Sequence, residues 1–214
     1  MFASSTGTQS TLKALQRNGW KLLMSPATLI RSRGKMAQRW PDGSPAPYAL
    51  DNGAWTCHQQ GKPFDEDAFR WAYDRIGADA EWVVAPDIVG GGIKSLDLTC
   101  SWLHRLHHSR VLIAVQDGIE PHHVEPLMAP GRGIFLGGST DYKLSMMVKW
   151  GDVAARHGAY YHVARVNTVR RVRMAQCARA HSVDGSSVTQ FPSTLTRLQR
   201  ARNQQCLFKP PTKP

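Results

Sequence analysis

Residues able to do chemistry follow short apolar runs at five places in this chain. Asp51 ends such a run in YALDNGAW, with Trp55 close behind it, and Asp184 follows another in HSVDGSS. A carboxyl group can serve as an acid, a base or a nucleophile. A neighbouring indole can stack on a flat ligand ring. The other residues of this set are Asp87 in VAPDIVGGG, Gln116 in IAVQDG, and Gly137 and Gly138 in FLGGST.

Each of these residues also has a simpler structural interpretation. An Asp after a strand often caps the next helix, as Asp87 could, or forms a turn, as Asp184 before GSS could. Trp55 could fill a hydrophobic core. Gln116 is harder to explain in this way, because a buried amide needs hydrogen-bond partners. The choice depends on the elements that carry these residues.

Apolar runs predict seven strands, at residues 21–25, 47–51, 81–87, 111–116, 133–138, 160–166 and 180–185. Helical patterns lie at residues 65–77, 95–108, 141–158 and 192–205, with Asp65 as a cap and Pro192 in a first turn. Alternating strands and helices predict a parallel sheet with helical crossovers. An eighth strand is not obvious, so either residues 1–12 supply it or the barrel is incomplete.

The chemistry-bearing residues favour a closed barrel over an open doubly wound sheet. They fall at the C-terminal ends of five different strands, as the mouth of a barrel requires. We therefore predict an α/β fold, a compact TIM-type (β/α)8 barrel that is a single domain over residues 1–214. Residues 1–19 are expected to form an N-terminal extension or helix, and residues 206–214 a flexible tail.

Charge points to a polyanionic partner. The chain holds 27 Lys and Arg against 16 Asp and Glu, a net charge of +11. Arginines crowd the last third, which favours nucleic acid as the partner, although solubility alone could explain the excess. The candidate phosphate contacts are Arg165, Arg170, Arg171 and Arg173.

No stretch is long and apolar enough to span a membrane, and the first residues lack the apolar core of a secretory signal. A cytoplasmic protein is expected. Four cysteines without a C-x-x-C pair favour reduced thiols over a zinc knuckle or a disulfide framework. His104, His107 and His108 in HRLHH could bring two imidazoles to one metal, but a solvated helix face is favoured because no acidic or cysteine ligand stands nearby. We expect neither a metal nor a cofactor.

In their order along the chain, the strand-end motifs resemble those of the tRNA-guanine transglycosylases, the base-exchanging TIM barrels of queuosine synthesis, and of the related deazapurine DNA modification enzymes. The likeness covers about residues 20–200. It implies that Asp184 is the nucleophile, forming a covalent glycosyl-enzyme at the ribose C1′, and that Asp51 is the general acid/base. It also implies a base-binding set composed of Trp55, Asp87, Gln116, Gly137 and Gly138.

The chain departs from the enzymes that act on tRNA. It has no C-x-C-x-x-C…H zinc insertion, and GSSVTQFP replaces the usual continuation after Asp184. The resemblance therefore favours DNA over tRNA as the polymer and implies a free deazaguanine as the second substrate. A homodimer or a partner subunit could complete the recognition surface. Three alternatives remain open. The first is a queuosine enzyme that acts on tRNA, as the tRNA-guanine transglycosylases do. An N-glycoside hydrolase would use the same carboxylates with water, and a non-catalytic nucleic-acid binder would need the arginines but neither Asp51 nor Asp184.

Overall fold

The computed structural model describes residues 1–32, 38–191 and 193–204, and its centre is a closed barrel of eight parallel strands. The strands follow one another around the barrel in chain order: β1 (Phe2–Ser4), β2 (Lys21–Met24), β3 (Tyr48–Leu50), β4 (Val83–Val84), β5 (Val111–Val115), β6 (Arg132–Leu136), β7 (Tyr161–Val163) and β8 (Ser182–Gly185). The predicted α/β TIM-type barrel is confirmed.

The first strand closes the barrel. Ala3 of β1 pairs with Leu22 on one side and with Gly185 on the other. The strand that the sequence patterns did not show therefore lies within residues 1–12, and the barrel is complete. The first helix, α1 (Gln9–Arg17), follows after a Thr8 cap, so residues 1–19 contain both a strand and a helix of the barrel.

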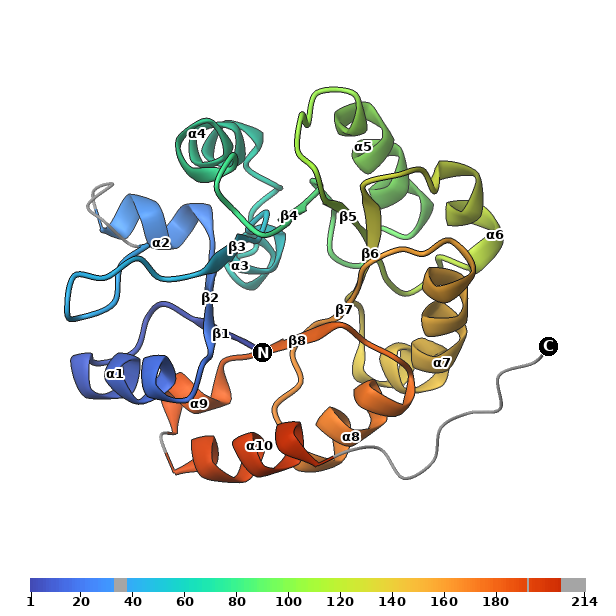
Figure 1. Ribbon diagram of the computed structural model, residues 1–214. Coiled ribbons are helices and arrows are strands. Elements are labelled where there is room, and N and C mark those ends of the chain that lie inside the picture. The colour runs from blue at the N-terminus through green and yellow to red at the C-terminus, as the bar shows by residue number, and fades with distance from the viewer. Residues whose placement is uncertain (33–37, 192, 205–214) are drawn as a thin grey trace.

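Helices surround the strands as an outer ring (Figure 1). They are α2 (Pro26–Arg31), α3 (Ala54–Gln59), α4 (Glu66–Ile76), α5 (Ile93–Leu103), α6 (Pro121–Val124), the 3-10 helix η1 (Glu125–Leu127), α7 (Thr140–Arg156), α8 (Val169–Cys177), α9 (Ser187–Gln190) and α10 (Thr194–Asn203). The four predicted helices correspond to α4, α5, α7 and α10. Asp65 caps α4, accepting a hydrogen bond from the Ala68 N–H at 2.9 Å. Pro192 and the tail 206–214 lie outside the described residues.

The barrel interior is packed with side chains rather than open. Alternation along each strand sends one set of residues inward, where Phe2, Ala49, Trp82 and Leu112 form a buried cluster. The other set packs against the helices. His162 joins the interior layer, with its ring 4.7 Å from that of Trp82. A ligand site formed by the strands must therefore lie above this layer, at one end of the barrel.

Two secondary predictions are wrong. Helix α5 ends at Leu103, so HRLHH does not form a helix face. His108 instead ties the segment to the barrel, because its Nε2 lies 2.9 Å from the Ala80 carbonyl and its Nδ1 accepts from the Arg110 N–H. Cys177 is disulfide-bonded, whereas Cys57 and Cys100 carry free thiols.

Within the described ranges, no group of three or more His, Cys, Asp and Glu could hold a metal ion. In the same residues, every helix is too short or too polar to cross a membrane.

Candidate active site

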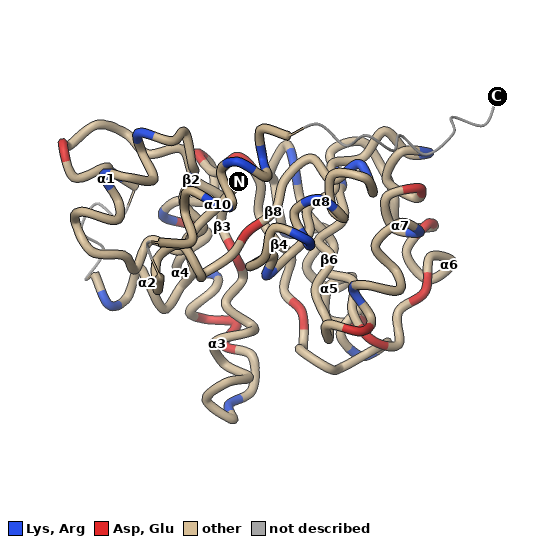
Figure 2. The backbone as a smooth tube through the Cα atoms, turned by 90° about the horizontal axis from the view of Figure 1, so that it is seen from below, with Lys and Arg blue, Asp and Glu red and all other residues tan. Residues whose placement is uncertain are grey.

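A cavity of about 470 Å³ opens at the C-terminal ends of the strands. In Figure 2 this end of the barrel is the one from which α3 projects, on the side away from the N-terminus. Eight residues singled out in the sequence lie on the cavity wall: Asp51, Trp55, Asp87, Gln116, Gly137, Gly138, Arg165 and Asp184. Parallel strands deliver their C-terminal residues to one mouth, which is why positions far apart in sequence meet here.

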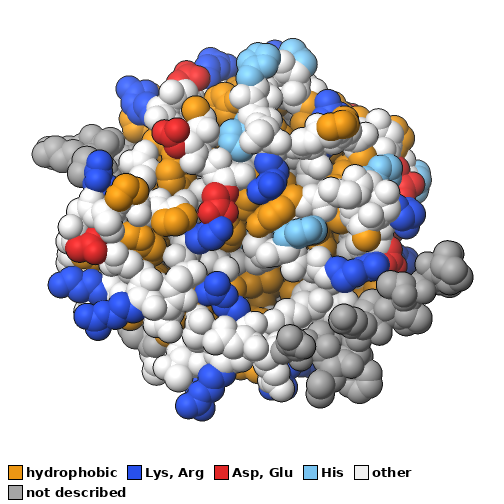
Figure 3. All heavy atoms as spheres, in the orientation of Figure 1, with side chains coloured by type: hydrophobic (Ala, Val, Ile, Leu, Met, Phe, Trp, Pro, Cys, Tyr) orange, Lys and Arg blue, Asp and Glu red, His pale blue; other side chains and the backbone are white. Residues whose placement is uncertain are grey.

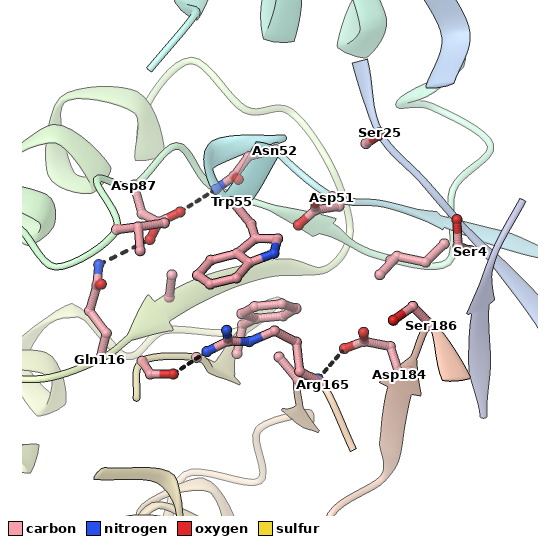
Figure 4. Close-up of a pocket in the computed structure, with 18 of the residues that line it drawn as sticks. Ser4, Ser25, Asp51, Asn52, Trp55, Asp87, Gln116, Arg165, Asp184 and Ser186 are labelled. Atoms are coloured by element: carbon pink, nitrogen blue, oxygen red, sulfur yellow. Dashed lines mark hydrogen bonds between the residues drawn. The ribbon is translucent and has the colours of Figure 1, made fainter. Parts of the chain in front are cut away.

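Two carboxyl groups share the cavity. Asp51 follows β3 and Asp184 lies in β8, and both side chains point into the same space beside Trp55 (Figure 4). Burial, then the negative charge of Asp184, then that of Asp87, raise the pKa of Asp51 to about 7. Asp51 can therefore give up or take a proton near neutral pH.

The D-N-G turn places Asp51 and starts the next helix. The turn needs a glycine, because Gly53 has φ +87° and a side chain there would meet the Pro26 ring. The Gly53 N–H donates to Asp51 Oδ2 at 3.2 Å, and Asn52 Oδ1 accepts from the Ala54 N–H at 2.9 Å. The first turn of α3 then carries Trp55 to the rim, where its side chain is 39% exposed.

Asp87 is buried in the segment that follows β4, between two amide donors. Asn52 Nδ2 donates to its Oδ1 at 2.7 Å, and Gln116 Nε2 donates to its Oδ2 at 3.0 Å. Burial raises the pKa of Asp87 to about 6, against the opposing effect of these two hydrogen bonds. The carboxyl group is fixed in place and still has lone pairs free to accept from a ligand.

Gln116 lines the cavity, but its amide is engaged with the protein. Its oxygen accepts from the Gly90 N–H at 2.7 Å, and its nitrogen also lies 2.7 Å from the Ile88 carbonyl and 2.8 Å from Ser95 Oγ. The amide therefore anchors both Asp87 and the loop after β4. Direct contact with a bound base would require one of these bonds to open, so that role stays a prediction.

The glycine pair follows β6. Gly137 continues the strand ladder by donating to the Val115 carbonyl at 2.9 Å. Gly138 has φ +78°, and a Cβ there would lie 2.6 Å from Asp117 Oδ2. In the part of the chain that the structure describes, no acceptor is bonded to the Gly138 N–H. That N–H is therefore available as a donor to a ligand oxygen.

Arg165 covers the indole that the sequence singled out. Its guanidinium lies 4.1 Å from the centre of the Trp55 ring and donates to the Gly138 carbonyl. Its backbone N–H donates to Asp184 Oδ1 at 3.1 Å. Arg165 adopts φ +56°, an uncommon conformation for a residue other than glycine. The cation thus occupies one face of the ring on which a base could stack.

The other candidate phosphate contacts lie outside the cavity. Arg170, Arg171 and Arg173 are on α8, which precedes β8 as predicted. Arg171 is half-buried next to Arg165. Burial is the main cause that lowers the pKa of Arg165, and the positive charge of Arg171 lowers it further. Arg173 donates to Gln204 at 2.6 Å. Lys and Arg side chains are spread over the face in Figure 3, among acidic and apolar ones, and form no single stripe there.

Three buried polar residues in or close to the cavity wall were not anticipated. His162 is fully buried beneath Asp184, Asn52 holds Asp87, and Lys143 donates to the Ala164 carbonyl at 2.9 Å. Burial, followed by the charge of Arg165, lowers the pKa of Lys143 to about 8. For His162, the sequence contains one indication of a buried role, because it is a polar residue within the apolar pattern YYHVARV.

The sequence matches no protein-family model, and no curated protein matches it.

Proposed function

We propose that this protein exchanges guanine in a nucleic acid, DNA in preference to tRNA, for a free 7-deazaguanine base. The observation that carries the proposal is the pair of carboxyl groups, Asp51 and Asp184, whose charges interact within one cavity at the mouth of the barrel. Asp51 changes protonation near neutral pH, as a group that must both give and take a proton should. A protein that only bound nucleic acid would have no use for this pair.

In the first half of the proposed reaction, the carboxylate of Asp184 attacks the ribose C1′ and the C1′–N9 bond breaks. The bonding electron pair leaves with the guanine, which takes the proton of Asp51. An ester between Asp184 and C1′ results. Forming the ester removes the negative charge of Asp184, one cause of the raised pKa of Asp51, and so favours proton release at this moment.

The second half reverses these events with a different base. The carboxylate of Asp51 takes the N9 proton of the incoming deazaguanine, whose N9 attacks C1′ and breaks the ester. Asp184 regains its charge, which raises the pKa of Asp51 again and keeps the proton there. Asp51 and Asp184 end the cycle in their starting states, so no net proton is gained or lost.

Recognition of the base is assigned to the far side of the cavity. Asp87, held by two amides, can accept from N1–H and the exocyclic amine of a guanine-type base. The free Gly138 N–H can donate to O6. Trp55 supplies the stacking surface once Arg165 turns away from its ring toward a phosphate of the bound strand.

A labelling experiment tests the proposal. The protein is incubated with radiolabelled guanine and, separately, with tRNA, duplex DNA and single-stranded DNA. We expect label in DNA with the wild type and with Asp97→Asn, an exposed control on α5, but none with Asp184→Asn. Release of guanine without uptake of label would identify a hydrolase, and neither uptake nor release from any polymer would refute the proposal.

A further inference from the structure

A hydrogen-bonded chain runs beneath the cavity from β8 to β7 and back. His162 Nε2 lies 2.9 Å from Asp184 Oδ1, and His162 Nδ1 lies 2.7 Å from Ser182 Oγ. The imidazole is completely buried. Ser182 and Asp184 are two residues apart on one strand, so both side chains point into the barrel and reach the same ring.

The surroundings determine which nitrogen of His162 carries the proton. Burial is the main effect on the pKa of His162 and lowers it, so the ring is neutral and has one N–H. An ionised carboxylate can only accept, whereas a hydroxyl can donate. The N–H therefore belongs on Nε2, facing Asp184, and Nδ1 accepts from Ser182.

Serine, histidine and aspartate in contact also form the triad of hydrolases, but the order relative to the cavity is reversed here. Asp184 lies on the cavity wall, whereas Ser182 is buried below it and does not contact the cavity. Ser182 therefore cannot be the nucleophile. The Asp184 carboxylate is therefore the end of this series of hydrogen bonds that contacts a ligand.

We infer that His162 is a positioning residue for Asp184. Together with the backbone N–H of Arg165, at 3.1 Å, its N–H holds Oδ1 of Asp184. Among the residues that the structure describes, Oδ2 has no hydrogen bond, so it is the oxygen left for attack on C1′. This role rests on the proposed base exchange, because it assigns Oδ2 as the attacking atom.

The interior packing prevents the imidazole from turning. Phe135 stacks on the imidazole with the ring centres 5.0 Å apart. The ring centres of Phe2 and Trp82 lie 5.9 Å and 4.7 Å from that of the imidazole. With the ring fixed, the direction of the Nε2–H bond is fixed as well. Asp184 thus receives its orientation from the barrel interior and keeps it whether or not a substrate is bound.

Two substitutions separate positioning from packing. In His162→Gln an amide N–H can occupy nearly the place of Nε2–H, whereas His162→Leu fills the space without a donor. For base exchange we expect His162→Leu to lower kcat about 100-fold with little change in KM, as misplacement of a reacting group does. His162→Gln should recover most of that loss. Equal activity of His162→Leu and wild type would overturn the inference, as would equal loss in both variants when both are folded.

A spectroscopic measurement tests the same inference without depending on activity. Nitrogen-15 NMR of the imidazoles should show His162 as the neutral Nε2–H form, with its proton signal shifted in Asp184→Ala. The Nδ1–H form would overturn the inference. If the Nε2–H form is found but the wild type exchanges no base, the proposed function fails while the positioning of Asp184 stands.

Discussion

Asp51→Asn gives a test of the site that needs no substrate. The pKa of Asp51 is about 7 in the folded protein against an ordinary value of 3.8. The folded chain therefore keeps a proton that the unfolded chain releases. Its stabilising contribution is complete below the unfolded pKa, and it is lost as the pH rises through the folded pKa.

The size of the effect follows from these two values. Between pH 5 and pH 8 the wild type should lose about 2.5 kcal/mol of unfolding free energy through this one group. The figure is an upper limit, because Asp51 is partly exposed to solvent. Asparagine cannot ionise, so Asp51→Asn removes this pH dependence.

Urea unfolding at pH 5 and pH 8 measures the difference. We expect the free energy of unfolding of Asp51→Asn, relative to wild type, to rise by about 2.5 kcal/mol between the two pH values. Asp97→Asn, exposed on α5, controls for the loss of a surface carboxylate. If the difference in unfolding free energy between Asp51→Asn and wild type is the same at both pH values, the pKa of Asp51 is not raised. Asp51 then cannot be the proposed acid and base.

Substitutions at three further places test separate parts of the site. Asp184→Asn should lower the pKa of Asp51, because it removes the second cause of the raised value, and carbon-13 NMR of the Asp51 carboxyl would detect this. An unchanged pKa would show that the charge of Asp184 does not act on Asp51. Trp55→Ala should weaken binding of the free base about tenfold, as measured by calorimetry, whereas Trp55→Phe should bind nearly as wild type; equal affinities would remove the stacking role. Replacing Arg170 and Arg171 with Gln should flatten the plot of log affinity against log salt by about 0.9 per lost phosphate contact; an unchanged slope would exclude both.

The residues at the strand ends could be predicted because a barrel of parallel strands brings the C-terminal ends of all its strands to one side. Any residue just after an apolar strand arrives at the same mouth, so Asp51, Asp87 and Asp184 could be grouped without knowledge of the packing. The same pattern could not reveal β1. That strand is three residues long, FAS, and its neighbours β2 and β8 define it more than its own sequence does.

Hydrogen-bond partners were beyond the reach of sequence patterns. Gln116 was expected to face a base, yet its amide anchors Asp87 and the loop after β4, because a buried amide takes the nearest available partners. His162 lies inside a strand and had no motif around it. Its relation to Asp184 depends on the register between β7 and β8, which pairs His162 with Ser182. Register is set by long-range packing.

The most direct test of the account is a search for the covalent bond between Asp184 and the nucleic acid. The protein is mixed with a guanine-containing DNA oligonucleotide, quenched in denaturant and analysed by intact mass spectrometry. We predict an adduct with the mass of protein plus oligonucleotide minus guanine, present in the wild type and absent in Asp184→Asn. Base exchange by the wild type without any such adduct, or the same adduct in Asp184→Asn, would contradict the account.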